Sequence, residues 1–428
     1  MKLLLPEVDY KLGFSEENDI FDRKRLARQL ESIIAHSDDD SLVLALDDQW
    51  GNGKTTFLKL WESELLNNDN FDVVYFDAFK NDYQDDAFLA LSSAIYPRIN
   101  NEKDKQKYIN AAKGVGKFIL KTSVKIGLRA ATLGAVKDTD FEGLDETIKG
   151  TVEEPIEKII EEKLKNAEQE QITIQYFKET ITNSANNKKI IFIIDELDRA
   201  RPDFSLDLLE KIKHVFNTKK LFFVLAMNKE QFKNTIQKRY GNIDAETYLS
   251  KFIHFWFSLP HPRDTKGEVT TIENFLSHIN QKMKINPSYD TSLVTLTNIL
   301  RATNASLRDC ERCYSLMMLI VASKPRMEKP FQLASAMLVY LKTKHPFVFE
   351  NLKSGNSDID SVTKPLNISA WKDTKADYIH KLIRTDLYSN DRIMASANPN
   401  TSYIFDQFGM PVKVFKDLLP YFESVISI

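Results

Sequence analysis

The residues with the clearest chemical potential lie in the run GNGKTT, residues 51–56, between an apolar stretch and a helix-like pattern. A glycine-containing turn between a strand and a helix points its backbone N–H groups at an anion bound at the helix N-terminus. In such a loop Lys54 reaches the β- and γ-phosphates of a nucleotide, and the Thr55 hydroxyl binds Mg²⁺. The run therefore predicts a phosphate-binding loop. Its expected nucleotide-binding residues are Trp50, Gly51, Asn52, Gly53, Lys54, Thr55 and Thr56.

One position departs from the usual pattern G-x-x-x-x-G-K-[ST], because its first glycine is replaced by Asp48. Gly51 and Gly53 remain where the backbone must come closest to phosphate. We expect the loop to tolerate phosphate if the Asp48 side chain is turned away from it.

A second informative run is KKIIFIIDELDRARP, residues 188–202. Its apolar part ends in Asp195, which we expect at the C-terminal edge of a sheet, where an acidic side chain orients Mg²⁺. Glu196 is suited to polarise the attacking water. An acidic pair at a strand end says little alone. Together with the phosphate-binding loop it predicts Mg²⁺-dependent hydrolysis of a nucleoside triphosphate, with Thr55 and Asp195 on the metal.

Phosphoryl transfer also needs a group that positions the lytic water and cations that neutralise charge. Asn228 ends the apolar run LFFVLAMN and is placed to hold that water, although a helix-capping asparagine is the alternative. Arg199 and Arg201 follow the acidic pair and can act on the phosphates in cis or across a subunit interface. Surface ion pairs are the alternative for both.

Further cations lie downstream. Arg308 and Arg312 are four residues apart in a helical pattern and can reach the nucleotide from a lid, unless they pack against Asp309 or Glu311. Lys251 is a weaker candidate and is more simply explained as a helix-surface lysine. The expected catalytic set is Glu196, Lys54, Asn228, Arg199 and Arg308.

Short apolar runs that alternate with helical patterns must position these groups. Near-continuous apolar runs are typical of parallel strands covered on both faces. The pattern predicts an α/β fold with a mainly parallel, five-stranded, doubly wound sheet and its ligand at the carboxyl ends of the strands. The candidate strands are Leu42–Asp47, Val73–Asp77, Ile190–Asp195, Leu221–Ala226 and His254–Ser258.

The chain is expected to divide into a core over residues 1–262, a helical lid domain over 263–345 and a C-terminal helical region over 346–428. A long insertion, about residues 98–187, interrupts the core. Its first half spaces five cations four residues apart, which predicts a basic helix face that pairs with the acidic second half or binds an anionic membrane or nucleic acid. These cations are Lys113, Lys117, Lys121, Lys125 and Arg129.

Composition bounds the class of protein. The 428 residues are 43% hydrophobic and carry a net charge of −3, which allows a large core and gives no overall sign of nucleic-acid binding. The two cysteines, Cys310 and Cys313, are too few for a disulfide framework. A zinc or redox role for this C-x-x-C pair is the minor alternative to two helix residues. With no apolar run long enough to span a bilayer, we expect a soluble, cytoplasmic protein.

Several segments in order resemble the KAP family of P-loop NTPases, within the additional-strand, catalytic-glutamate class. The opening DYKLGFSEENDIFDRKRLA is similar to the family's N-terminal segment, which lies near the nucleotide. The resemblance covers roughly residues 8–320 and implies a P-loop NTPase fold, with a helical insertion and a helical C-terminal region, that uses ATP and Mg²⁺. The other matching segments are QWGNGKTTF, VVYFDAFKNDYQDD, IIDELDR, FVLAMNKEQFKNTI and AETYLSKFIHFWFSLP.

Two further departures from the family preserve chemistry: Phe79 stands where a tryptophan is usual, and Glu196 where Asp is frequent. Many family members carry transmembrane helices after the second strand, whereas the cationic stretch here resembles the soluble members. Several bacterial relatives are associated with exclusion of phage or plasmids, which sets an expectation only.

The resulting hypothesis is a soluble ATPase that couples its nucleotide cycle to conformational change in an assembly, in antiviral defence. We expect a homo-oligomer or a co-encoded effector protein as partner. One alternative is an ATP-gated oligomerisation or binding switch with slow turnover. The other is a nucleic-acid-stimulated motor that uses the cations between Lys113 and Arg129.

Overall fold

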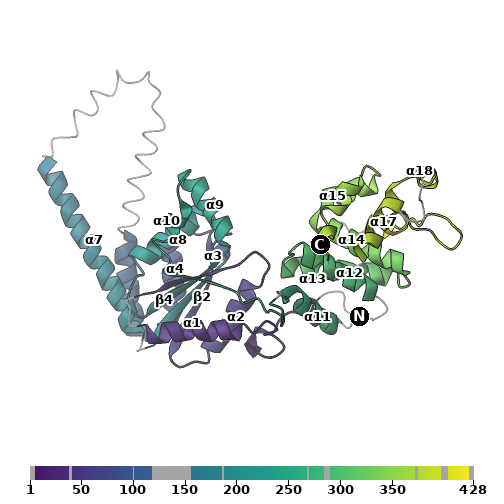
Figure 1. Ribbon diagram of the computed structural model, residues 1–428. Coiled ribbons are helices and arrows are strands. Elements are labelled where there is room, and N and C mark those ends of the chain that lie inside the picture. Colours follow the sequence, from purple (N-terminus) through teal and green to yellow (C-terminus); the bar gives the residue numbers. More distant parts are fainter. Residues whose placement is uncertain are drawn as a thin grey trace, which may run out of the picture.

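The described part of the chain forms two lobes, one built on a β-sheet and one built from helices (Figure 1). The computed structural model describes residues 5–37, 41–99, 101–117, 156–185, 188–267, 269–283, 290–371, 375–396 and 403–423.

The sheet has five parallel strands in the order β2-β3-β4-β1-β5. The strands predicted from the sequence are thereby confirmed, with ends that differ by one or two residues. Their bounds are β1 Val43–Asp47, β2 Phe71–Asp77, β3 Lys189–Asp195, β4 Leu221–Met227 and β5 Phe255–Ser258.

Helices cover both faces of the sheet, so the doubly wound arrangement is also confirmed (Figure 1). Helices α1 (Lys24–His36) and α2 (Lys54–Leu65) pack on one face. Helices α4 (Ala87–Ile95) and α8 (Pro202–His214) pack on the other. Side chains that alternate along a strand enter opposite cores, which is why the strands read as continuous apolar runs.

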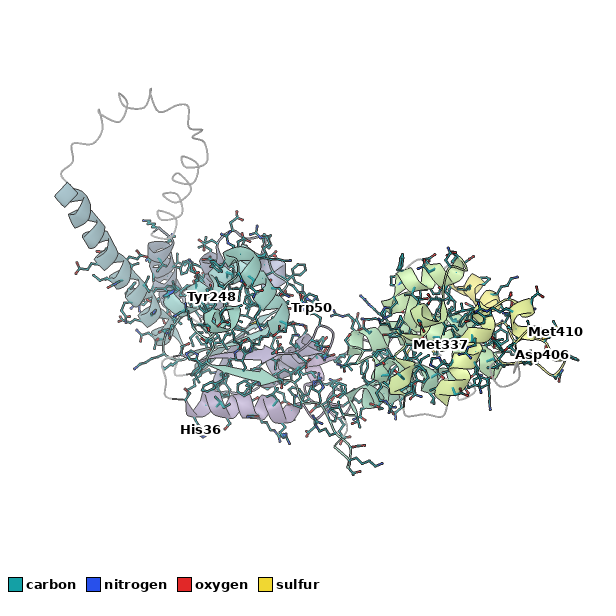
Figure 2. The ribbon with its side chains drawn as sticks, turned by 45° about the horizontal axis from the view of Figure 1, so that its top comes forward. His36, Trp50, Tyr248, Met337, Asp406 and Met410 are labelled. Carbon is teal, nitrogen blue, oxygen red and sulfur yellow. The ribbon has the colours of Figure 1, made fainter. Side chains whose placement is uncertain are left out.

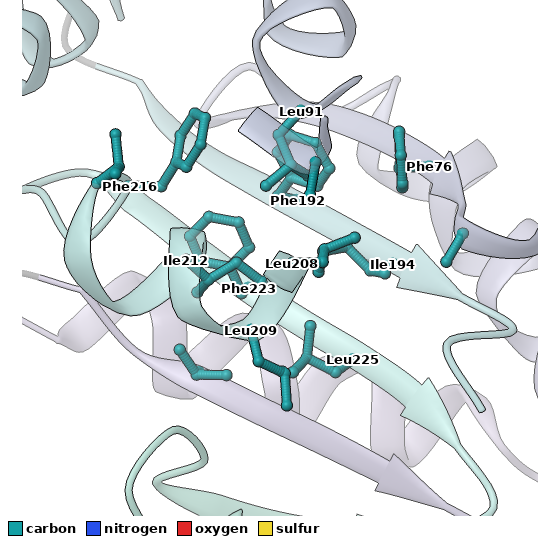
Figure 3. Packing of buried hydrophobic residues seen from close by; sticks show 14 of the residues in the cluster. Phe76, Leu91, Phe192, Ile194, Leu208, Leu209, Ile212, Phe216, Phe223 and Leu225 are labelled. Atoms are coloured by element: carbon teal, nitrogen blue, oxygen red, sulfur yellow. The ribbon is translucent and has the colours of Figure 1, made fainter. Parts of the chain in front are cut away.

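Aromatic and branched side chains fill the core under α8. The rings of Phe192 and Phe223, from neighbouring strands, stack with centroids 5.5 Å apart. Leu208 and Ile212 from α8 cover them (Figure 3). This packing fixes the strands relative to one another and so fixes where their carboxyl ends lie.

Short helices connect these elements. They are η1 Tyr10–Leu12, α3 Ala78–Asn81, η2 Tyr96–Arg98, α9 Lys229–Tyr240 and α10 Ala245–Leu249.

The helical lobe has one continuous hydrophobic core that runs from Leu276 to Phe422, on both sides of the boundary expected near residue 345. The division at that residue stays a prediction. Its helices are α11 Thr271–Met283, α12 Asp290–Ala302, α13 Leu307–Ser323, α14 Lys329–Lys344, α15 Pro346–Lys353, α16 Ile359–Thr363, η4 Ile368–Ala370, α17 Lys375–Leu387, α18 Asn390–Met394 and α20 Phe415–Glu423.

Cys310 and Cys313 are fully buried in that core, and neither forms a disulfide. Burial raises the pKa of Cys313 to about 12 and that of Cys310 further, so both thiols stay protonated. Their environment is that of packed core residues, the alternative favoured from sequence.

Two parts of the insertion are described: a helical segment over residues 102–117 and helix α7 (Ile156–Ser184). Lys113 and Lys117 are exposed on the first, whereas Lys121, Lys125 and Arg129 lie outside the described residues. Within the described part of the chain, no helix is long and apolar enough to cross a bilayer.

Helix α7 is anchored to the core through Phe177, whose ring lies 5.3 Å from that of Phe88 and 5.5 Å from that of Phe216, between centroids. Phe177→Ala should lower the free energy of unfolding by about 3 kcal/mol or more, because it removes a fully buried ring. Chemical denaturation measures the change. Tyr176→Ala is the matched control, since Tyr176 is 49% exposed and should cost little. Equal losses in the two variants would contradict the proposed anchor.

Candidate functional site

The predicted phosphate-binding loop connects β1 to α2 and depends on two glycines. Gly51 and Gly53 have φ angles of +86° and +88°, a region that side-chain-bearing residues rarely adopt. The loop lies at the carboxyl end of β1, and Trp50 marks it in Figure 2 on the side of the sheet lobe that faces the helical lobe.

Lys54 is held at the mouth of the loop by backbone oxygens. Its Nζ donates to the carbonyl oxygens of Asp48 and, at 3.3 Å, of Gln49. Burial lowers the pKa of Lys54, and the carboxylates of Asp198 and Asp48 counter part of that effect. Among the described residues, the hydrogen bonds of the ammonium group go to neutral backbone oxygens.

Asp48 turns its side chain into the protein, as the sequence-based expectation required, and it does not line the cavity described below. Its Oδ1 accepts hydrogen bonds from the Gln49 N–H and the Asn52 side-chain amide, both at 2.6 Å. His261 Nε2 lies 3.5 Å from Oδ2. Burial acts to raise the pKa of Asp48, but these donors outweigh it and hold that pKa below its usual range.

The Asn52 side chain donates its hydrogen bond to Asp48, and Asn52 is not among the residues that line the cavity. With the side chain engaged in this way, the Asn52 backbone is the part left to contact nucleotide, and this contact stays a prediction.

Asp195 ends β3 and is almost fully buried. Its Oδ2 accepts a hydrogen bond from the Tyr75 hydroxyl at 2.7 Å, and its Oδ1 accepts one from the Glu196 N–H at 2.9 Å. Burial and the adjacent carboxylate raise the pKa of Tyr75, so the phenol stays a donor. These two bonds fix the orientation of the predicted metal-binding carboxylate.

Glu196 follows in a left-handed backbone conformation, with φ +55°. Its Oε1 forms an ion pair with Arg199 Nη1 at 2.7 Å. Burial raises the pKa of Glu196; Asp195 acts in the same direction, and Arg199 acts against it. A carboxylate with a raised pKa and access to the cavity is suited to accept a proton from water.

The remaining sequence candidates divide into two groups. Arg308 lines the cavity, whereas Arg201 pairs with Asp85 at 3.4 Å outside it. Asn228 accepts a hydrogen bond from the Gln231 N–H at 3.1 Å as the cap of α9, and it does not line the cavity. Arg312 and Lys251 do not line it either. Roles for these residues in hydrolysis stay predictions.

A cavity lies where the phosphate-binding loop, the pair Asp195–Glu196 and Arg308 meet. Its volume of 510 Å³ is within the range usual for ligand sites. Four segments line it. They are the N-terminal segment (residues 5–23), the loop and start of α2 (50–60), the end of β3 and the turn after it (195–199), and the helical lobe through α11 and the start of α13.

The N-terminal segment bridges the two lobes. Its Phe14 packs on Phe57 of α2, with ring centroids 5.7 Å apart. Glu17 pairs with Lys282 of α11 at 2.7 Å, and Phe21 packs on Phe275 with centroids 6.3 Å apart. The cavity therefore has an aromatic and apolar side next to its charged, phosphate-binding side.

The helical lobe also contacts the loop directly. The Arg308 N–H donates to the Gly51 carbonyl at 3.1 Å. A Cβ on Gly51 would stand 2.8 Å from both Arg308 Cβ and Ser306 Oγ. Gly51 is thus required for its conformation and for the approach of α13.

Four groups at this site were not identified from the sequence: Arg23, Tyr75, Asp198 and the α11 residues that face the N-terminal segment. Asp198 accepts a hydrogen bond from the Trp50 indole, which joins the loop to the acidic turn. The D-x-x-D spacing of Asp195 and Asp198 was visible in the sequence. Arg23, Tyr75 and the α11 residues are identified only by contacts between distant segments of the chain.

Comparison with known proteins gives one family. The model of the KAP family P-loop domain matches residues 23–323. No curated protein matches the chain. Among solved structures, the ORC2 protein of Aeropyrum pernix in ADPNP–ADP complexes is 12% identical, over 94% of this chain and 84% of its own, with a TM-score of 0.37. Cdc6p from Pyrobaculum aerophilum is 11% identical, over 99% of this chain and 90% of its own, with a TM-score of 0.43.

Gly51→Ala should destabilise the contact between the loop and α13. The positive φ alone should cost about 1–2 kcal/mol, and the contact with Arg308 and Ser306 adds to it. Thermal unfolding measures the loss. Gly355→Ala is the control, since Gly355 has φ +73° in the turn after α15 and open space where its Cβ would stand. Equal losses in the two variants would show that the close approach of α13 contributes nothing.

Proposed function

The chain belongs to the KAP family of P-loop domains, and from this premise we propose that it binds ATP with Mg²⁺ in the 510 Å³ cavity and hydrolyses it. The carrying observation is that Lys54, Thr55 and the pair Asp195–Glu196 line one cavity, although about 140 residues separate the two segments.

Each phosphate-binding role follows from position. The loop N–H groups at the start of α2 and the Lys54 ammonium would hold the β- and γ-phosphates. Thr55 and Asp195 would hold Mg²⁺, because hydroxyl and carboxylate oxygens are ligands that it prefers. When bound, the metal supplies charge neutralisation at the phosphate oxygens.

Glu196 would act as the general base. Its carboxylate must be ionised to accept a proton from the attacking water, and Arg308 at the cavity wall would neutralise charge on the transferred phosphoryl group. Arg199 holds Glu196 by their ion pair. This pair engages Oε1, so the proton would pass to the other carboxylate oxygen or to a Glu196 released from Arg199.

That ion pair also supports a second candidate function, an ATP-gated switch with slow turnover. If the ion pair with Arg199 slows proton acceptance by Glu196, hydrolysis is slow and the triphosphate stays bound for a long time. The contacts of the N-terminal segment with α11 and of α13 with the loop would let nucleotide occupancy change the relation of the two lobes.

We further propose that this conformational change acts within an assembly, as a homo-oligomer or with a co-encoded effector in the cytoplasm. The family resemblance supports a role in defence against phage or plasmids. Stimulation by nucleic acid is a weaker candidate, supported only by the exposed Lys113 and Lys117 among the described residues.

Glu196→Gln should keep ATP affinity and lower kcat by at least about 100-fold, because the amide cannot accept the proton. A phosphate-release assay and calorimetry on the purified chain measure the two quantities. Wild-type turnover in this variant would remove Glu196 from the reaction.

Lys54→Ala is the companion variant and should lose ATP binding itself. It removes the cation at the loop mouth without touching the acidic pair. Unchanged ATP affinity would contradict the assignment of the loop.

Arg199→Ala should shift the acid limb of the kcat profile to higher pH. The Arg199 charge lowers the pKa of Glu196, so its removal raises that pKa further, and the ionised base is lost earlier as pH falls. Steady-state rates across the acid and neutral range test this. Arg201→Ala is the control and should leave the acid limb in place, since Arg201 pairs with Asp85. An unmoved limb in Arg199→Ala would show that Glu196 is not the titrating group.

A further inference from the structure

The side chain of Arg23 is buried in the wall of the cavity, with 5% of the residue exposed. Its Nε and Nη2 have no hydrogen-bond partner among the residues that the structure describes. Resting on the proposed nucleotide site, we propose that Arg23 binds the α-phosphate of the nucleotide and determines affinity for diphosphates and triphosphates alike.

The position of the guanidinium group indicates which phosphate it meets. Arg23 Nη1 lies 2.9 Å from where a Cβ would stand on Gly53, and Thr56 is the next nearest side chain to that point. Lys54 and Thr55 are directed to the β- and γ-phosphates and the metal. The α-phosphate, between those groups and the nucleoside, is the one that faces Gly53, Thr56 and Arg23.

The backbone of Arg23 is fixed before any ligand arrives. Asp19 accepts hydrogen bonds from the N–H groups of Arg23 at 2.7 Å and Lys24 at 2.9 Å. The guanidinium carbon of Arg23 lies 4.5 Å from the centre of the Phe21 ring. Since both supporting residues belong to the N-terminal segment, nucleotide held by Arg23 would also hold that segment.

Burial makes this arginine costly without an anion. A buried cation that lacks hydrogen bonds loses its hydration without replacement. Burial lowers the pKa of Arg23 to about 10, against the opposing effect of Asp48 and Asp19, so it still carries its charge at neutral pH. Arginine donors match phosphate oxygens in geometry, and such charge-assisted bonds are strong.

The test is calorimetric binding of ADP and of the two ADPαS diastereomers to the full-length chain. Arg23→Met should weaken ADP binding roughly 10- to 100-fold, because it removes a charge-assisted contact. In the wild type, one ADPαS diastereomer should bind more weakly than ADP, and this difference should vanish in Arg23→Met. Arg23→Lys should recover part of the affinity. Arg25→Met, at an exposed arginine two residues on, is the matched control and should bind ADP as the wild type does.

Unfolding without nucleotide separates this role from a structural one. Arg23→Met should not lower the ligand-free midpoint, because it removes a buried charge that lacks hydrogen bonds. If Arg23→Met lowers the unfolding midpoint but still binds one ADPαS diastereomer more weakly than ADP, Arg23 only balances the charge of Asp48. That result would overturn the proposal. Unchanged ADP affinity in Arg23→Met would overturn it as well. If the wild type binds neither ADP nor ATP, the proposed function fails first, independently of Arg23.

Discussion

The parallel alignment of the central strands is the constraint on which the candidate site depends. Asp47 at the end of β1 lies opposite Met227 of β4, and Ile194 near the end of β3 lies opposite Leu225. The phosphate-binding loop and the acidic pair therefore leave the sheet at one edge, with only β4 between their strands. Buried packing on both faces holds that alignment, and the stacked rings of Phe192 and Phe223 belong to the core on one of them.

A few long-range contacts complete the cavity around this edge. The Gly51 carbonyl receives the N–H of Arg308, and Glu17 pairs with Lys282. Both contacts join different segments around the cavity, and all four residues line it. A ligand that displaces or strengthens either contact changes how the lobes meet, which is the physical basis for coupling nucleotide to conformation.

The charges of the site are partly satisfied by the protein itself. Lys54 donates to backbone carbonyls and Arg199 to Glu196, while Arg23 keeps two N–H groups without a hydrogen-bond partner. An arriving nucleotide would thus replace weak partners for Lys54 and supply missing ones for Arg23. Such preorganised cations spend little energy on rearrangement when the anion binds.

The five strands, the doubly wound sheet, and the loop and acidic pair at its edge could all be predicted from the sequence. Each follows from local patterns: apolar runs of strand length, and residue types at the turn that follows. The remaining features depend on contacts in the folded chain, including those between distant segments. They turn Asp48 inward through Asn52, engage Asn228 as a helix cap, and bring Arg23 against Gly53. Local patterns predict which residues form a helix or strand. Contacts between distant segments depend on how those elements pack, and that packing depends on many positions at once.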